Sequence, residues 1–237
     1  MKKTFVFVLL CLVSLLCGDD FDRMLNPPPR RIRIDDKQRL TVPLRSSDVE
    51  IVVSKEALPI TRFAAEELQR FLQRILDNVI PLTDSPTAGK ISFICGLNSW
   101  SRAAGIDEKE LTPESFIIRR SGRKIYIAGR DGKLLSRNHG VGKSTSPQYK
   151  VEEVLRNGYW PQFHEHATLF GVYEFLERFA GVRFYFPHAL GTIVPRKPLV
   201  LPGFDIFERP DAVVRHFGGI YRGGWEDVTP GEKSQPF

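Results

Sequence analysis

The acidic pairs of the sequence are its first candidates for chemistry. Glu226 and Asp227 follow Trp225, and paired carboxylates beside an aromatic ring that can stack on a sugar are typical of glycosidic bond cleavage. Adjacent residues of a strand point to opposite faces, however, so these two carboxylates cannot readily flank one bond. Glu66–Glu67 and Glu152–Glu153 are better explained as solvated faces. We therefore predict no catalytic residue in this chain.

Two further patterns are suited in principle to ligand binding. His164 and His166 stand two residues apart and could share a metal with His139, but this spacing is better explained by solvent-facing loop histidines that hold no metal. The run Gly142-Lys143-Ser144 is similar to the end of a phosphate-binding loop. That motif needs glycine where Arg137 stands, and no apolar strand leads into it. We predict neither a metal nor a cofactor.

One positive charge interrupts an apolar segment. Arg183 lies between Val182 and Phe184. Its guanidinium could bind a substrate carboxylate as a bidentate pair, or it could hold this domain against a neighbouring one. The structural role is the preferred interpretation, and substrate binding stays open.

Hydrophobic periodicity indicates the elements that must position these side chains. Apolar residues recur at three- and four-residue steps over 60–76 and 169–179, which predicts two helices, with Gly181 as the C-terminal cap of the second. Glu66 and Arg70 are expected to pair on the outer face of the first helix. Strands are predicted at 49–53, 80–82, 90–95, 116–120, 124–128, 182–186 and 199–201, with Ser121 and Gly122 turning a hairpin. This order predicts a sheet with helices packed on it.

The N-terminus has the pattern of a secretory signal peptide over residues 1–18. Lys2 and Lys3 precede an uncharged apolar run from Phe5 to Leu16, which is too short for a membrane span of about 20 residues. We therefore expect a secreted or periplasmic protein with no membrane span. A lipid anchor on Cys17 is the alternative, although Leu16 stands where a small residue is usual.

Charge and cysteine content narrow the class of partner. The net charge of +6 and pI of 9.3 come without a basic stripe carrying interleaved aromatic residues, so no nucleic-acid partner is predicted, whereas acidic polysaccharides fit this charge. Cys11 and Cys17 lie in or beside the leader, which leaves Cys95 with no intrachain disulfide partner after cleavage. Cys95 alternates with Ile91 and Phe93 and is predicted to be a buried, unreactive thiol.

Two segments lack a regular pattern. Residues 19–44 are rich in proline and arginine and are expected to form an extended linker that ends in an edge strand. Residues 132–166 are dominated at their start by Gly, Ser, Lys, Asn and Pro, which predicts a long exposed insertion. The folded domain is thus expected over 45–208, with this insertion inside it.

Several stretches together resemble a known family. The stretches are 167–177 (ATLFGVYEFLE), 181–187 (GVRFYFP) and 191–195 (GTIVP), preceded by the helix with AAEEL at 64–68 and the strand ending in Cys95-Gly96. In order and spacing they resemble the N-terminal domain of α-glucuronidases, glycoside hydrolase family 67, and the related domain of large secreted bacterial glycosidase-like proteins. The resemblance covers roughly residues 49–210.

The resemblance implies an α+β fold of the β-hexosaminidase-like accessory type, a mixed sheet with helices packed on one face. It also implies a (β/α)₈ barrel that follows and carries the catalytic carboxylates. Residues 209–237 are similar to the start of such a barrel, in which Arg215 could reach a sugar carboxylate and Trp225 could stack on the ring. The implied partners are a catalytic barrel domain and a polysaccharide that includes acidic sugars.

The expected function is therefore that of a non-catalytic N-terminal domain of a secreted α-glucuronidase-like enzyme of polysaccharide degradation, truncated before its barrel. A stand-alone carbohydrate-binding or interaction module is the alternative, and exposed aromatic rings at Tyr159, Trp160 or Trp225 would favour it. A complete small hydrolase is a third hypothesis, but it needs a cleft with paired carboxylates, which the sequence does not indicate.

Overall fold

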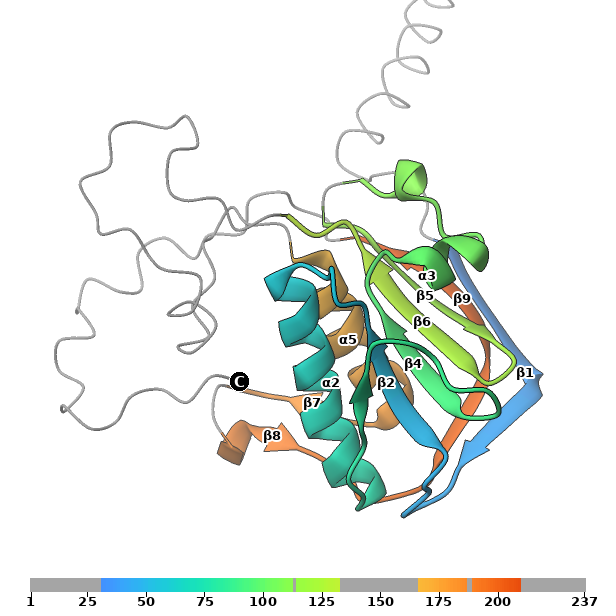
Figure 1. Ribbon diagram of the computed structural model, residues 1–237. Coiled ribbons are helices and arrows are strands. Elements are labelled where there is room, and N and C mark those ends of the chain that lie inside the picture. The colour runs from blue at the N-terminus through green and yellow to red at the C-terminus, as the bar shows by residue number, and fades with distance from the viewer. Residues whose placement is uncertain (1–30, 113, 133–165, 187–188, 210–237) are drawn as a thin grey trace, which may run out of the picture.

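The computed structural model describes residues 31–112, 114–132, 166–186 and 189–209 (Figure 1). The predicted signal peptide, most of the 132–166 insertion and residues 210–237 lie outside the described residues, and so do Arg215, Trp225, His139 and His164. The elements are β1 Arg31–Val42, β2 Val49–Val53, α2 Pro59–Leu76, β3 Leu82–Thr83, β4 Ile91–Cys95, α3 Ser99–Ala103, the 3₁₀ turn η1 Glu108–Glu110, β5 Phe116–Ser121, β6 Lys124–Gly129, α5 Ala167–Phe175, the π turn η2 Leu176–Ala180, β7 Arg183–Phe184, the 3₁₀ turn η3 Ala189–Gly191, β8 Thr192–Ile193 and β9 Leu199–Glu208.

A mixed seven-stranded sheet in the order β1-β9-β5-β6-β4-β2-β3 forms the centre of the fold. Strands β3, β2, β4 and β6 run parallel to one another, and β5, β9 and β1 continue the sheet with antiparallel pairs. Because β1 lies at one end of this order, the predicted edge strand after the proline-rich segment is found there. The α+β class and the mixed sheet implied by the resemblance are confirmed.

Helices α2 and α5 cover one face of this sheet (Figure 1). Proline occupies the first position of α2, where its missing N–H costs nothing, and Asp77 ends the helix in the left-handed conformation at φ 53°. The ring of Phe175 in α5 meets that of Phe93 in β4 edge to face, with centroids 5.4 Å apart. Each such fully buried large apolar side chain contributes roughly 1.5–3 kcal/mol through removal from water.

The opposite face carries a smaller apolar cluster. Val52, Ile94 and Tyr126 from three neighbouring strands pack there against Trp100 of the short helix α3. The two long helices thus share one face, as expected, whereas α3 covers the other face, which the sequence did not predict.

Several predicted elements shift in the structure. The hairpin of β5 and β6 is present, but it turns at Gly122 and Arg123 because Ser121 already pairs with Lys124. The predicted strand 182–186 shrinks to β7, which pairs with β8 in a separate two-stranded sheet. The short strand expected at 80–82 is found at Leu82–Thr83. The last strand, in contrast, is longer than predicted, since β9 finds partners on both sides in β1 and β5.

The expected pair of Glu66 and Arg70 is wrong. Arg70 pairs with Glu67 at 2.6 Å, three residues before it, and Glu66 remains exposed. Glu67 is buried, with 6% of its surface exposed, and its carboxylate also accepts a hydrogen bond from the Tyr173 hydroxyl at 3.0 Å. The prediction of a solvated Glu66–Glu67 face therefore fails at Glu67, because α5 packs against this position of α2.

Candidate binding cleft at the carboxyl ends of the parallel strands

The parallel strands β2, β4 and β6 end at the same edge of the sheet, and the loops that follow them surround a cleft of about 180 Å³. In open sheets with parallel strands, this carboxyl edge is the usual place for a ligand. The cleft is lined by side chains and backbone from all three loops and from the first turn of α2, including Ser54, Glu56, Thr61, Gly96, Asn98, Arg102, Glu108, Arg130 and Asp131. We call it the carboxyl-edge cleft.

Asp131 joins the elements around this cleft. Its Oδ2 accepts a hydrogen bond from the Thr61 hydroxyl in the first turn of α2 at 2.6 Å, and its Oδ1 accepts one from the backbone N–H of Thr168 in the first turn of α5 at 2.8 Å. The Thr168 hydroxyl in turn accepts from the N–H of Gly129, the last residue of β6, at 3.1 Å. A carboxylate at two helix N-termini is favoured by the helix dipoles and supplies acceptors for otherwise unbonded donors.

Two glycines allow the helices to approach the strand ends this closely. A Cβ at Gly129 would lie 2.5 Å from the Cβ of Ala167 and 2.6 Å from its backbone carbon. A Cβ at Gly96 would lie 2.3 Å from Cγ2 of Thr61, and Gly96 has the left-handed φ of 84°. Larger residues at either position would push the helices away from the cleft.

The turn after β4 is fixed by a capping box. The Asn98 side chain accepts from the N–H of Ser101 at 2.9 Å, and the Ser101 hydroxyl accepts from the N–H of Asn98 at 2.8 Å. Asn98 also donates its side-chain amide to the carbonyl of Cys95 at 3.2 Å. Burial raises the pKa of the Cys95 thiol to about 12, so this residue is the unreactive buried cysteine that the sequence predicted.

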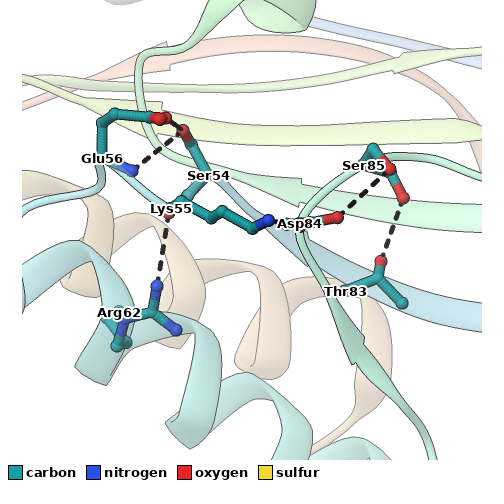
Figure 2. Close-up of polar contacts among 7 residues, drawn as sticks. All are labelled: Ser54, Lys55, Glu56, Arg62, Thr83, Asp84 and Ser85. Carbon is teal, nitrogen blue, oxygen red and sulfur yellow. Dashed lines mark hydrogen bonds and ion pairs between the residues drawn. The ribbon is translucent and has the colours of Figure 1, made fainter.

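A network of charged and hydroxyl groups continues from the cleft to the end of β3 (Figure 2). Lys55 pairs with Asp84 at 2.8 Å, and the Ser54 hydroxyl donates a short hydrogen bond to Glu56. The hydrogen bond from Ser54 lowers the pKa of Glu56, and that from Lys55 lowers the pKa of Asp84. Both carboxylates therefore stay ionised at neutral pH, which suits hydrogen-bond acceptors and not a general acid.

The charges of the cleft are mixed. Arg102 and Arg130 stand among Glu56, Glu108 and Asp131, together with the amide of Asn98 and the hydroxyls of Ser54 and Thr61. Such a set offers donors and acceptors to a polar, uncharged ligand such as a sugar hydroxyl. The described part of the chain holds no group of three or more His, Cys, Asp or Glu residues able to bind a metal.

Glu67 is the described carboxylate whose pKa is raised, and burial is the main cause. A raised pKa is what a general acid needs. Its oxygen, however, contacts Arg70 and Tyr173 between the two helices, and Glu67 does not line the carboxyl-edge cleft. Glu67 therefore serves as a buried contact between α2 and α5.

The predicted site residue within the described part, Arg183, lies away from the cleft. It is exposed in β7, and its Nη1 donates to the carbonyls of Glu177 and Val182, each at 2.7 Å. The first bond satisfies a carbonyl in the last turn of the helix that α5 and η2 form, and the second lies just beyond the predicted cap at Gly181. The other predicted site residues, Arg215 and Trp225, fall outside the described residues.

The residues that build the cleft were not singled out from the sequence. One signal was available: each parallel strand is followed at once by small or polar residues, as in Cys95-Gly96-Leu97-Asn98 and Gly129-Arg130-Asp131. The structure also brings the two ends of the 132–166 insertion together beside the cleft, where Asp131 forms an isolated bridge with His166.

Comparisons with known proteins give distant similarities. No family model and no curated protein matches the sequence. Similar solved structures include a family GH115 4-O-methyl-α-glucuronidase with specificity for decorated arabinogalactans, with 19% identity and a TM-score of 0.36, where 59% of this chain and 14% of that chain are covered. For CpGH84D the values are 13% identity, a TM-score of 0.46, and coverage of 83% and 25%.

A GH20 β-N-acetylhexosaminidase from Streptomyces coelicolor A3(2) is also similar, at 13% identity and a TM-score of 0.40, with 75% of this chain and 25% of that chain covered. The chain therefore spans a quarter or less of the length of these three structures. All three are glycoside hydrolases. Among the helices that the structure describes, none has the length and apolar character of a membrane span.

Proposed function

We propose that this chain contributes a non-catalytic N-terminal domain to a secreted, α-glucuronidase-like glycoside hydrolase that degrades polysaccharides together with a (β/α)₈ catalytic barrel. The observation that carries the proposal is the fold: a mixed sheet with α2 and α5 on one face is the arrangement that the sequence resemblance implies. The stretches of the resemblance lie on α2, β4, α5, β7 and β8 of this fold and on the turns that adjoin them.

The chemistry of the carboxyl-edge cleft supports a non-catalytic role. Glycoside hydrolysis needs one carboxyl group that is protonated at the working pH. The hydrogen bond from Ser54 lowers the pKa of Glu56, and both oxygens of Asp131 already accept hydrogen bonds, from Thr61 and Thr168. Neither Glu56 nor Asp131 is therefore placed to donate a proton to a leaving oxygen.

Incubation of the purified chain with aldouronic acids and aryl glycosides tests the proposal. We expect no release of sugar or aryl alcohol above a buffer control. Hydrolysis by the wild-type chain that disappears in the variant Glu56→Gln or Asp131→Asn would overturn the non-catalytic assignment and support the complete small hydrolase.

A stand-alone carbohydrate-binding module is the second candidate, favoured by the hydrogen-bonding groups of the cleft. Calorimetric titration of the chain with neutral oligosaccharides separates the two candidates. Binding that is lost on substitution of Glu56 by Ala, with an unchanged unfolding temperature, supports the binding module. No binding supports a domain that works only beside its barrel.

We propose export through cleavage after Gly18, with the mature chain in the periplasm or outside the cell. The intact mass of the exported protein tests this. A mature chain beginning at Asp19 supports simple secretion, whereas a chain beginning at a lipid-modified Cys17 supports the anchored alternative.

A further inference from the structure

A second hollow, of about 470 Å³, lies at the opposite edge of the sheet, where β4 and β6 begin. It is formed by the loop that leads into β4 and by the turn of the β5–β6 hairpin, which lie at the same end of the sheet (Figure 1). Its lining includes Pro86, Thr87, Lys90, Ser121, Arg123 and Lys124. We call it the amino-edge pocket.

The charged residues that line this pocket all carry positive charge. They are Lys90, Arg123 and Lys124, and none of them has a carboxylate partner within the part of the chain that the structure describes. Arg119 of the neighbouring strand β5, in contrast, pairs with Asp205 at 2.9 Å. Three like charges held together in a hollow repel one another, and a bound anion relieves this repulsion.

The backbone of the pocket is held in place by tight turns. Gly89 and Gly122 adopt left-handed φ values of 82° and 58°, and the N–H of Lys90 bonds to the carbonyl of Thr87 at 3.3 Å. The N–H of Ser92 donates to the carbonyl of Arg123 at 3.1 Å, which ties the start of β4 to the hairpin turn. The cations therefore project from a fixed frame, and less entropy is lost when they bind a ligand.

The buried carboxylate of Glu50 holds the loop that leads into β4 through hydrogen bonds. Glu50 is fully buried in β2, and its Oε1 accepts from the N–H of Thr87 at 2.6 Å and from the hydroxyl of Ser92 at 2.8 Å. Glu50 does not line the pocket itself, so the charged groups of the lining remain the three cations.

We propose that the amino-edge pocket binds an acidic glycan through the carboxylate or sulfate groups of its sugars. The three cations supply the charge for an oxyanion, Thr87 and Ser121 supply hydroxyls for hydrogen bonds, and Pro86 and the lysine stems supply apolar surface for a sugar ring. The inference rests on the proposed carbohydrate-related function for the sugar part of the ligand, and on the pocket itself for the anion.

Affinity measurements on the full chain test this inference with three polymers: polygalacturonate carries carboxylates, dextran sulfate carries sulfates, and dextran is neutral. We expect binding of one or both anionic polymers. Binding of polygalacturonate shows that the pocket accepts carboxylates, and binding of dextran sulfate shows that it accepts sulfates. The triple variant Lys90→Gln, Arg123→Gln, Lys124→Gln should lose at least tenfold in affinity.

A control variant removes the same charge elsewhere. Arg33, Lys37 and Lys109 are exposed and lie outside the pocket, and their replacement by Gln should change affinity less than threefold. Circular dichroism and thermal unfolding establish that both variants are folded. Equal losses in the two variants, or no binding of either anionic polymer by the wild-type chain, would overturn the inference. Binding of neutral dextran alone would overturn it too, yet leave the proposed carbohydrate role standing.

Discussion

The close approach of α2 to the end of β4 makes Gly96 a sensitive position. In the variant Gly96→Ala, the new Cβ meets Cγ2 of Thr61 at 2.3 Å, a distance that forces the Thr61 side chain, α2 or the β4 loop to move. The left-handed φ of 84° adds strain for a non-glycine residue. We expect about 1–2 kcal/mol from the backbone conformation and about 1–3 kcal/mol from the overpacking.

Two companion variants separate these two costs. Gly89 has nearly the same φ, 82°, but nothing lies within 4 Å of a Cβ built there, so Gly89→Ala should carry the backbone cost alone. Thr61→Ser removes Cγ2 and keeps the hydroxyl that donates to Asp131. In the background of Thr61→Ser, Gly96→Ala should therefore cost little more than Gly89→Ala does.

Urea denaturation of the full chain, followed by circular dichroism, gives the free energy of unfolding for each member of this double-mutant cycle. A coupling of about 1–3 kcal/mol between positions 61 and 96 is the expected result. If Gly96→Ala and Gly89→Ala cost the same, or if Thr61→Ser gives no rescue, the close packing of α2 on the strand end does not determine stability.

Three further predictions concern ionisable groups. Burial raises the pKa of Glu67, so the folded state holds its proton more tightly than the unfolded chain and gains stability as pH falls from this raised pKa toward 4.5. Urea titrations of the wild type and of Glu67→Gln should therefore show that the wild type gains unfolding free energy relative to the variant as the pH falls through that window. A difference between the two that does not change with pH would contradict this. Asp131→Ala should cost about 1–3 kcal/mol because Thr61 and Thr168 lose an acceptor, and an unchanged urea midpoint would refute the bridging role. Native Cys95 should resist thiol reagents at pH 8 and react in denaturant, as peptide mass mapping can show, whereas labelling of the folded chain would argue against burial.

The sequence predicts the elements whose pattern is local. The apolar periodicity over 60–76 and the cap at Gly181 depend on residues within one or two turns, and the structure confirms them. The β5–β6 hairpin is equally local, because a two-residue turn with glycine in its first position brings the strands together. These features need no knowledge of distant parts of the chain.

The length of β9 could not be predicted from the local sequence pattern. Pro202 and Gly203 interrupt the alternation of β9, so the sequence predicts a strand of only three residues, 199–201. The longer strand forms because β1 and β5 supply hydrogen-bond partners on its two sides, with a register irregularity between Asp35 and Leu40 in β1. The length of β9 is therefore set by the strands that pair with it.

Residues 60–76 determined by themselves that an amphipathic helix would form, and the alternation of Cys95 with Phe93 determined that its thiol would face a core. Only the tertiary structure decided that Glu67 is buried and that Asp131 bridges two helix N-termini, because their partners, Tyr173 and Thr168, come from α5. Periodicity fixes which face of an element is apolar, since it depends on neighbours along the chain. The partner of a polar group depends on which elements meet in space, and this is set by how the whole sheet and its helices pack.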